Sequence, residues 1–377
     1  MPQAILAPIR YARYALGFDA RILARDYWMI LQGKHRRAIR ERKGTCTLPI
    51  RLTRAVIVAT YPQGSEIFST VNLLDALVAN GFYVIVVSSR ELDEHLSAEL
   101  LPHCHCLLER HNIGHDFGAY KFGLEWFQRQ DFLGRVEVLG LANDSMFYPK
   151  RFAEELGTLL SCEHPWMGLY ESFVWHHHVQ SFLQLFRREV FDAPCFKSFW
   201  SRYRPLSLRR HAIHKGEIGL SGCLQAAGYA SSVLYTTSRL RGDLMRRLGQ
   251  GKNEDLPLHR ILRLSLNDDY FAALATAAQS NLTPGFVVEE LVSRVVRQGE
   301  LHNPTHGVGL LCNYLYGAPL KRDLCYRGTH TIADLVALSH EFDEAEKAKI
   351  LSDLRRKGLY VSLMTKRQRH LFDTSRI

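Results

Sequence analysis

A carboxylate directly after an apolar run is the first sign of chemistry in this sequence. In Asn143-Asp144-Ser145 the charge of Asp144 follows a run that reads as a buried strand, where an unpartnered charge is costly. Carboxylate and phosphate oxygens together suit Mg²⁺ or Mn²⁺. We therefore interpret Asp144 as a ligand of a divalent metal that carries a diphosphate. Ordinary turn chemistry is the alternative for this tripeptide.

A second segment, residues 110–120, combines glycines with polar side chains. Its glycines allow a close approach of the backbone, and Asp116 stands where a helix is predicted to begin. This composition favours a loop that handles a nucleotide, with a plain helix cap at Asp116 as the alternative. The predicted ligand contacts in this loop are Arg110, Asn112, Gly114 and Asp116.

A third carboxylate, Glu217, lies at the predicted start of a helix within the segment 214–221. A glutamate with an ordinary pKa of about 4.3 is ionised at neutral pH, as a general base must be. We predict that Glu217 takes the proton from an acceptor hydroxyl, and Asp116 is the rival carboxylate. A favourable charge at a helix N-terminus is the alternative for Glu217.

Three consecutive histidines follow Trp175. Neighbouring side chains of an extended backbone point to opposite faces, so three in a row do not face one ion. We expect a ligand contact from His178 rather than a metal site. The eight cysteines contain no C-x-x-C pair, which argues against structural zinc and for reduced thiols.

The elements that must position these residues alternate between strand and helix from residue 54 onward. Strands are predicted at 55–60, 82–87, 105–108 and 136–142, with helical spacing between them. Such alternation predicts an α/β domain with a mainly parallel sheet and helices on both faces. Ligands of such sheets bind beyond the carboxyl ends of the strands, where Thr60, Arg110 and Asn143 lie.

Length and charge indicate how the chain is divided into domains. Its 377 residues, 46% apolar and 23% charged, exclude a disordered or collagen-like chain. The net charge of +10 is concentrated in residues 1–54, where twelve Lys and Arg stand against three Asp and Glu. We predict a basic amphipathic helical leader at 1–53, a catalytic domain at 54–245 and a mainly helical subdomain at 246–377.

Aromatic and aliphatic side chains alternate with the arginines of the leader. This pattern suits a helix that lies on an anionic membrane surface. A helix packed on the main domain is an equal alternative, and nucleic-acid binding is a third, less favoured one. Because no run of about 18 apolar residues and no signal peptide are recognised, we expect a cytoplasmic protein, peripheral at the inner face of the cell membrane.

Taken in order, these motifs resemble the rhamnan synthesis protein F family. The resemblance covers roughly residues 54–330, although Ile113, His115 and the basic leader depart from the family pattern. The segments that carry it are Arg110–Lys121, Asn143–Ser145 with Pro149, Gly168–Ser172 with His178–Phe182, Glu217–Ser221, and Asn303–His306 with Gly317–Lys321.

The resemblance implies a bacterial glycosyltransferase with a GT-A-like, Rossmann-type sheet. Such an enzyme transfers a sugar, often rhamnose carried on dTDP, to a lipid-linked or polysaccharide acceptor in cell-surface polysaccharide, lipopolysaccharide or O-antigen synthesis. Donor contacts are then expected from the loops after the strands, and an inverting reaction is the simplest mechanism. The predicted donor contacts outside segment 110–120 are Thr60, Asn143, Ser145 and His178.

Two alternatives to an enzyme remain open at this point. One is a non-catalytic GT-A-like scaffold in a polysaccharide assembly complex, and the other is a basic membrane- or nucleic-acid-binding protein. The intact set of Asn112, Asp116, Asp144 and Glu217 favours the enzyme.

Overall fold

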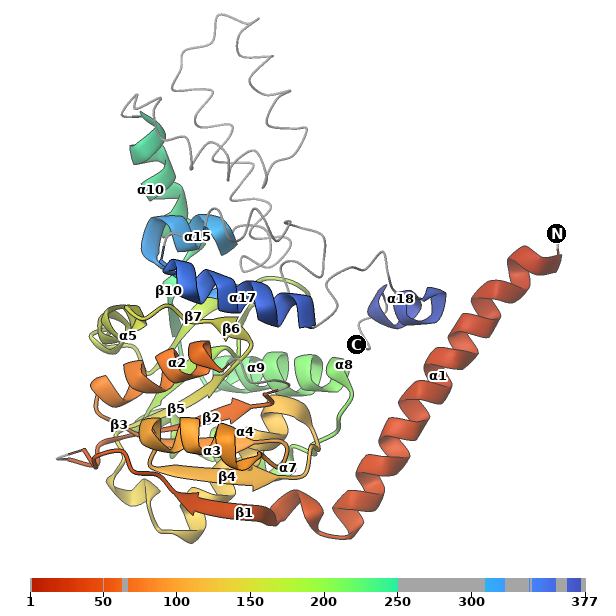
Figure 1. Ribbon diagram of the computed structural model, residues 1–377, viewed down its shortest axis with the longest axis horizontal. Coiled ribbons are helices and arrows are strands. Elements are labelled where there is room, and N and C mark those ends of the chain that lie inside the picture. Colours follow the sequence, from red (N-terminus) through yellow and green to blue (C-terminus); the bar gives the residue numbers. More distant parts are fainter. Residues whose placement is uncertain are drawn as a thin grey trace, which may run out of the picture.

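The computed structural model describes residues 2–49, 51–62, 67–249, 309–322, 339, 341–356 and 365–373. Its centre is a nine-stranded sheet flanked by helices (Figure 1). The strands follow the order β1-β4-β3-β2-β5-β9-β7-β10, and β8 pairs with β7. Their bounds are β1 (Ala38–Lys43), β2 (Arg54–Thr60), β3 (Phe82–Ser88), β4 (Cys106–Arg110), β5 (Val138–Asn143), β7 (Trp166–Ser172), β8 (His178–Val179), β9 (Leu183–Arg187) and β10 (Ser231–Tyr235).

The sheet is mainly parallel. The parallel pairs are β4 with β3, β3 with β2, β2 with β5, and β7 with β10. Strand β9 runs antiparallel to β5 and β7, and β1 runs antiparallel to β4 at the edge. A small second sheet pairs β6 (Met146–Phe147) with β11 (Leu320–Lys321).

Alternating residues of the central strand face two separate cores, as a sheet covered on both faces requires. In β2, Val56 and Val58 pack into one core, whereas Ala55, Ile57 and Ala59 pack into the other. The first core lies under α2 (Phe68–Ala79), α3 (Glu94–Leu100) and α5 (Phe152–Leu160). The second lies under α4 (His115–Arg129), α7 (Pro194–Arg202) and α9 (Ile218–Ala226). The predicted fold class is therefore confirmed.

Three of the described C-terminal helices pack on the first core. They are α10 (Thr237–Gly249), α15 (Gly309–Tyr316) and α17 (Glu344–Arg356), and they contribute Leu244, Leu310 and Ile350. Helical spacing in the sequence predicts helices at 256–266, 269–278, 287–298, 332–342 and 344–357. The last is present as α17, whereas the first three and most of the fourth lie outside the described residues.

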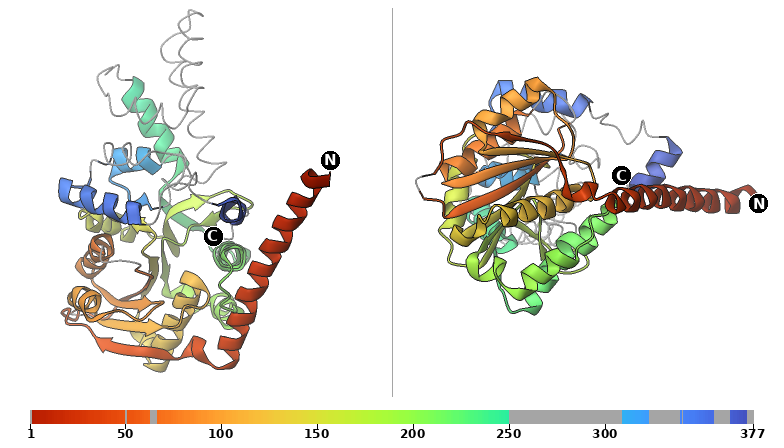
Figure 2. Two further views of the ribbon diagram at one scale, coloured as in Figure 1. Left: turned by 45° about the vertical axis from the view of Figure 1, so that its right-hand side comes forward. Right: turned by 90° about the horizontal axis from the view of Figure 1, so that it is seen from below.

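The predicted leader is a long helix followed by an edge strand. Helix α1 (Pro2–Leu31) projects away from the sheet, with α18 (Lys366–Asp373) beside it (Figures 1 and 2). One face of α1 packs on the domain, because Asp26 is fully buried and accepts hydrogen bonds from the backbone N–H and the hydroxyl of Ser207. Strand β1 belongs to the sheet, so the leader as predicted at 1–53 includes part of the α/β domain.

Candidate functional site

Two neighbouring parallel strands bring the Asp144 carboxylate against the loop after β2. Ala59 pairs with Asn143 in the sheet, and the Asp144 N–H donates to the Ala59 carbonyl at 3.2 Å. The Tyr61 N–H in turn donates to Asp144 Oδ2 at 3.0 Å. The partly exposed Asp144 carboxylate therefore stands at the carboxyl edge of the sheet, where ligands of such folds bind.

The neighbours of Asp144 shape the turn that presents it. Asn143 is buried, and its Nδ2 donates to the Ser181 carbonyl at 3.0 Å and to the Tyr120 hydroxyl oxygen at 3.2 Å. Its Oδ1 accepts the N–H of Ser145 at 3.1 Å and also the Ser145 hydroxyl. The amide of Asn143 is thus fully occupied by the protein, which makes Asn143 and Ser145 supports of Asp144.

Three carboxylates share this edge of the sheet. Burial and then the charges of Asp144 and Glu217 raise the pKa of Asp116 from 3.8 to about 7, while the Lys321 ammonium opposes the rise. Asp116 comes from the first turn of α4, and Lys321 comes from β11. Residues more than 200 positions apart in sequence therefore act on one another here. A site with this excess of negative charge gains from a bound cation.

Glu217 does not open a helix, contrary to the sequence prediction. It is the last residue of a π-helical turn, η4 (Ala212–Glu217), which continues directly into α9. Only 16% of its side chain is exposed, so it lies inside the site rather than at a loop rim. Gly216 permits this placement because a Cβ there would stand 2.7 Å from the Phe117 ring.

His178 holds the Glu217 carboxylate. Nδ1 of His178 lies 2.7 Å from the His176 carbonyl, which only accepts, so Nδ1 carries a proton. Nε2 lies 3.4 Å from Glu217 Oε1, and an ionised carboxylate also only accepts. Burial alone lowers the pKa of His178, but the hydrogen bond and charge of Glu217 raise it above its ordinary value. The contact with Glu217 thus favours the protonated imidazole, and the Ser181 hydroxyl donates to the second carboxylate oxygen, Oε2, at 3.2 Å.

Hydrogen bonds of buried residues fix the loop after β4. Arg110 is fully buried, and its guanidinium donates to the Ile113 carbonyl at 2.6 Å and to the Ser89 hydroxyl oxygen at 3.2 Å. The Gly114 N–H donates to Ser207 Oγ at 2.9 Å, its φ is +82°, and a Cβ there would lie 2.5 Å from Pro205. Arg110 and Gly114 thus shape the loop, and Asn112, partly exposed, remains its candidate for ligand contact.

Thr60 offers an unused hydrogen-bonding group at the same edge. The residue is 4% exposed, and its Oγ1 has no hydrogen-bond partner among the described residues. A buried hydroxyl without a partner is unfavourable. A bound donor that supplied a partner would remove this cost.

The residues at this edge fit a metal shared with a ligand. Within the described ranges, no group of three His, Cys, Asp or Glu side chains is arranged to hold an ion alone. Mg²⁺ is commonly bound by one or two carboxylates together with substrate phosphates and water. Asp144, with Asp116 nearby, matches that donor set, and the histidine run does not form a metal cluster.

Lys321 is the site residue that sequence reasoning did not assign. Its ammonium acts on the Asp116 carboxyl and lies 4.6 Å from the centre of the Phe182 ring. The signal available in the sequence was its place at the end of the Gly317–Lys321 segment. Strand β11 pairs with β6, directly after Asp144, and this pairing carries Lys321 to the site.

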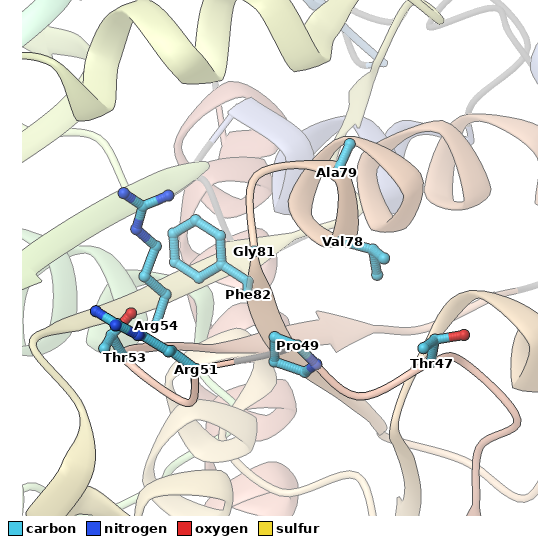
Figure 3. A pocket seen from close by; sticks show the side chains of 9 residues that line it. All are labelled: Thr47, Pro49, Arg51, Thr53, Arg54, Val78, Ala79, Gly81 and Phe82. Carbon is cyan, nitrogen blue, oxygen red and sulfur yellow. The ribbon is translucent and has the colours of Figure 1, made fainter.

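A separate cavity of about 250 Å³ lies at the opposite end of the sheet (Figure 3). It is lined by residues at the amino ends of β2 and β3, among them Arg54 and Phe82. Arg54 donates to the Asn80 carbonyl at the end of α2 at 2.7 Å, which gives this arginine a structural role. The cavity is therefore distinct from the predicted site.

Asp116→Asn is expected to stabilise the protein at high pH. Because the pKa of Asp116 is raised from 3.8 to about 7, the folded state holds its proton more tightly than the unfolded state. That contribution is complete below the unfolded pKa and is lost as pH rises through the folded pKa. The melting temperature of the variant should exceed that of the wild type above about pH 7 and match it below about pH 4. A difference in melting temperature of equal size at both pH values, or no difference at either, would contradict the raised pKa. The control is Asp192→Asn, which changes a carboxylate in an exposed ion pair with Lys197.

The family resemblance is confirmed by comparison with known sequences. Residues 84–248 match the sequence model of the family described as rhamnan synthesis protein F. This range includes Asp116, Asp144, His178 and Glu217.

Two curated relatives match about half of the chain. An uncharacterized protein, y4gN, of Sinorhizobium fredii is 28% identical over 222 residues, 56% of each chain. The virulence protein VirA of Vibrio anguillarum is 26% identical over 170 residues, 45% of this chain and 54% of VirA. The match thus spans little more than half the length of either relative.

The solved structures that are similar to this chain have low TM-scores. A nucleotide-diphospho-sugar transferase from Desulfovibrio desulfuricans is 11% identical, with 66% of this chain and all of that chain covered and a TM-score of 0.31. The mannosyltransferase PcManGT from Pyrobaculum calidifontis, in complex with GDP-Man and Mn2+, is 12% identical, with coverages of 92% and 99% and a TM-score of 0.30.

Proposed function

We propose that the protein is a nucleotide-sugar-dependent glycosyltransferase. The observation that carries this proposal is the gathering of Asp116, Asp144, Glu217 and Lys321 at the carboxyl edge of a mainly parallel sheet. These are the groups that the transfer of a sugar from a nucleoside diphosphate needs. The match of residues 84–248 to the rhamnan synthesis protein F family supports the same class of reaction.

On the donor side, the chain binds and orients the diphosphate. Asp144 is the ligand for a divalent ion, Mg²⁺ or Mn²⁺, which when bound neutralises charge on the leaving diphosphate. Lys321 adds a fixed positive charge near Asp116. Thr60 and Asn112 are the candidates for hydrogen bonds to the nucleoside.

On the acceptor side, Glu217 takes the proton of the attacking hydroxyl. The acceptor oxygen forms a bond to the anomeric carbon while the bond from that carbon to the diphosphate oxygen breaks, and the diphosphate keeps the electron pair. His178 and Ser181 orient the Glu217 carboxylate through contacts of 3.4 and 3.2 Å. A single displacement of this kind inverts the anomeric centre, and positioning and charge stabilisation supply most of the rate.

The finer assignment follows the family name. We propose a donor that carries rhamnose on dTDP, and an acceptor that is a lipid-linked or growing cell-surface polysaccharide, such as lipopolysaccharide O-antigen. The support is the described role of the matching family in rhamnan synthesis.

Thermal shift against nucleotides tests the proposed function. dTDP, UDP and GDP are each added with and without Mn²⁺, and one nucleotide at 100 times its dissociation constant should stabilise the protein by about 2.7 kcal/mol. The proposal expects a single preferred nucleotide and a larger shift with Mn²⁺. No shift with any nucleotide would contradict it.

We further propose that α1 places the protein on an anionic membrane surface at the inner face of the cell membrane. Three large apolar side chains of α1 are exposed: Leu16, Trp28 and Leu31 are 64%, 63% and 81% exposed, and the last two are one helical turn apart. Arg13 and Arg21 are exposed on the same helix. Apolar residues flanked by arginines suit the headgroup boundary of an anionic bilayer. Among the described residues, no helix is long and apolar enough to cross a membrane.

Replacing Leu16, Trp28 and Leu31 together with serine should weaken binding to anionic liposomes at least about tenfold, because each buried apolar side chain contributes about 1.5–3 kcal/mol. Binding by the wild type should also fall with added salt, which screens the arginines. Flotation or co-sedimentation measures both effects, and Trp175→Ser, at an exposed tryptophan of the domain, is the matched control. If the triple variant binds liposomes as well as the wild type does, α1 only packs on the domain. Truncation at Arg54 is a poorer test, because it also removes β1 and Asp26.

A further inference from the structure

Two large aromatic side chains stand exposed on the loop between β7 and β8. Phe173 is 48% exposed and Trp175 is 60% exposed. The backbone at Trp175 is left-handed, with φ of +68°, a conformation that bulky residues rarely adopt. Such a conformation persists where the surrounding contacts fix it, and it is concentrated at binding sites.

Each of the two rings contacts the ring of a histidine. The Trp175 ring lies 4.6 Å from the ring of His214, and the Phe173 ring lies 5.0 Å from that of His177. His177 is itself fixed, because its Nε2 lies 2.9 Å from Glu171 Oε2. The exposed faces are thus held in place rather than free to collapse onto the domain.

The same contacts tie the loop to the proposed base. His214 belongs to the π-helical turn that ends at Glu217, and π-helical turns are frequent at functional sites. At its other end the loop leads into His178, whose Nε2 lies 3.4 Å from Glu217. Trp175 is therefore connected to Glu217 by two independent short routes through the structure.

We infer that Trp175, supported by Phe173, is a stacking platform for the sugar ring of the acceptor; this inference rests on the proposed function. A pyranose has a face of C–H groups that packs on an aromatic ring, and its hydroxyl groups then remain at the ring edge. A sugar stacked on Trp175 would keep its hydroxyl groups free for Glu217, the group that must take the proton, to which Trp175 is linked through His214 and His178. The three remaining tryptophans outside α1 are at most 7% exposed, so among tryptophans of the domain only Trp175 offers such a face.

Fluorescence quenching tests the platform without any need for turnover. In a Trp28→Phe background, Trp175 is the one exposed tryptophan among the four that remain, so acrylamide reports on it selectively. The probes are methyl glycosides of rhamnose, mannose, glucose and galactose, each with and without the nucleotide that binds. At least one glycoside should protect Trp175 from quenching.

Variants at the platform give the size of the effect. Once a protecting glycoside is found, Trp175→Ala should weaken its binding about fivefold, the lower end of what stacking of a base on an aromatic side chain contributes. Because this variant lacks the fluorescent reporter, its binding is measured by isothermal titration calorimetry. Trp175→Phe should restore most of the loss. Because both changes lie on an exposed loop, the nucleotide-induced thermal shift should stay as in the wild type, which also shows that the variants fold.

The outcomes separate the platform from the proposed function. If nucleotide binds but no glycoside protects Trp175, the platform is wrong while the proposed function stands. If a glycoside protects Trp175 but no nucleotide binds, the platform stands and the transferase assignment falls. Weaker liposome binding by Trp175→Ser would instead show that the Trp175 ring inserts into the membrane. That result would overturn the platform.

Discussion

Glu217→Gln should reduce turnover by about 10²–10⁴-fold while the affinity for the nucleotide sugar stays nearly unchanged, because loss of a general base acts on the transition state alone. Glutamine keeps the shape of the side chain and can still accept the Ser181 hydroxyl, but it cannot take a proton. The measurement is kcat together with the dissociation constant of the donor. A second readout is the His178 imidazole, whose pKa should fall when the Glu217 charge that raises it is removed.

An exposed pair of the same chemistry supplies the control. His95 and Glu99, both on α3, form a glutamate–histidine contact at 3.6 Å. Glu99→Gln should leave turnover close to the wild type. Asp116→Asn should instead weaken donor binding; loss of turnover at Asp116 together with loss of donor affinity at Glu217 would exchange the two roles.

Asp144→Asn should abolish most of the metal-dependent gain in nucleotide binding. Asparagine keeps the size of the side chain and an oxygen for the Tyr61 N–H, 3.0 Å away in the wild type, but it removes the charge. With the nucleotide at 100 times the wild-type dissociation constant, the wild type should gain about 2.7 kcal/mol and the variant much less. Thermal shift with and without Mn²⁺ measures the difference, with Asp192→Asn as a matched surface control.

The metal role of Asp144 has a direct contrary result. Full turnover by Asp144→Asn, combined with a wild type that is indifferent to EDTA, would exclude it. Lys321 would then be the leading candidate for carrying the diphosphate charge, because its ammonium already acts on the Asp116 carboxyl of this site.

The local pattern of apolar residues was sufficient to predict the parallel strands at the centre of the sheet. Strands β2 to β5 are short apolar runs separated by helical spacing, so their parallel arrangement and two-sided cover could be expected. Strand β1 could not be found in this way, because its sequence AIRERK is charged and shows no buried residue. Charged residues are common on edge strands, which need no apolar face and resist pairing with other chains.

The candidate site was predictable only where it follows strands. Thr60 ends β2, Asp144 directly follows β5, and Asp116 lies in the first turn of the helix after β4. The rule that ligands bind at the carboxyl ends of parallel strands brings these three together. Lys321 and the pairing of His178 with Glu217 depend on contacts between distant segments, which no local pattern contains. The helix start predicted at Glu217 was wrong because the helical backbone already begins at Arg209 and continues through the π-helical turn Ala212–Glu217 into α9.

The central claim is that this edge of the sheet transfers a sugar from a nucleotide with Glu217 as the base. The most direct test incubates wild type and Glu217→Gln with dTDP-rhamnose and the common UDP and GDP sugars, in the presence of Mn²⁺ and a bacterial lipid-linked glycan extract, and measures the nucleoside diphosphate released. We predict release from one donor by the wild type, suppressed by EDTA and reduced about 10²-fold or more in the variant. Equal release by the two proteins, or nucleotide binding without release from any donor, would contradict the claim.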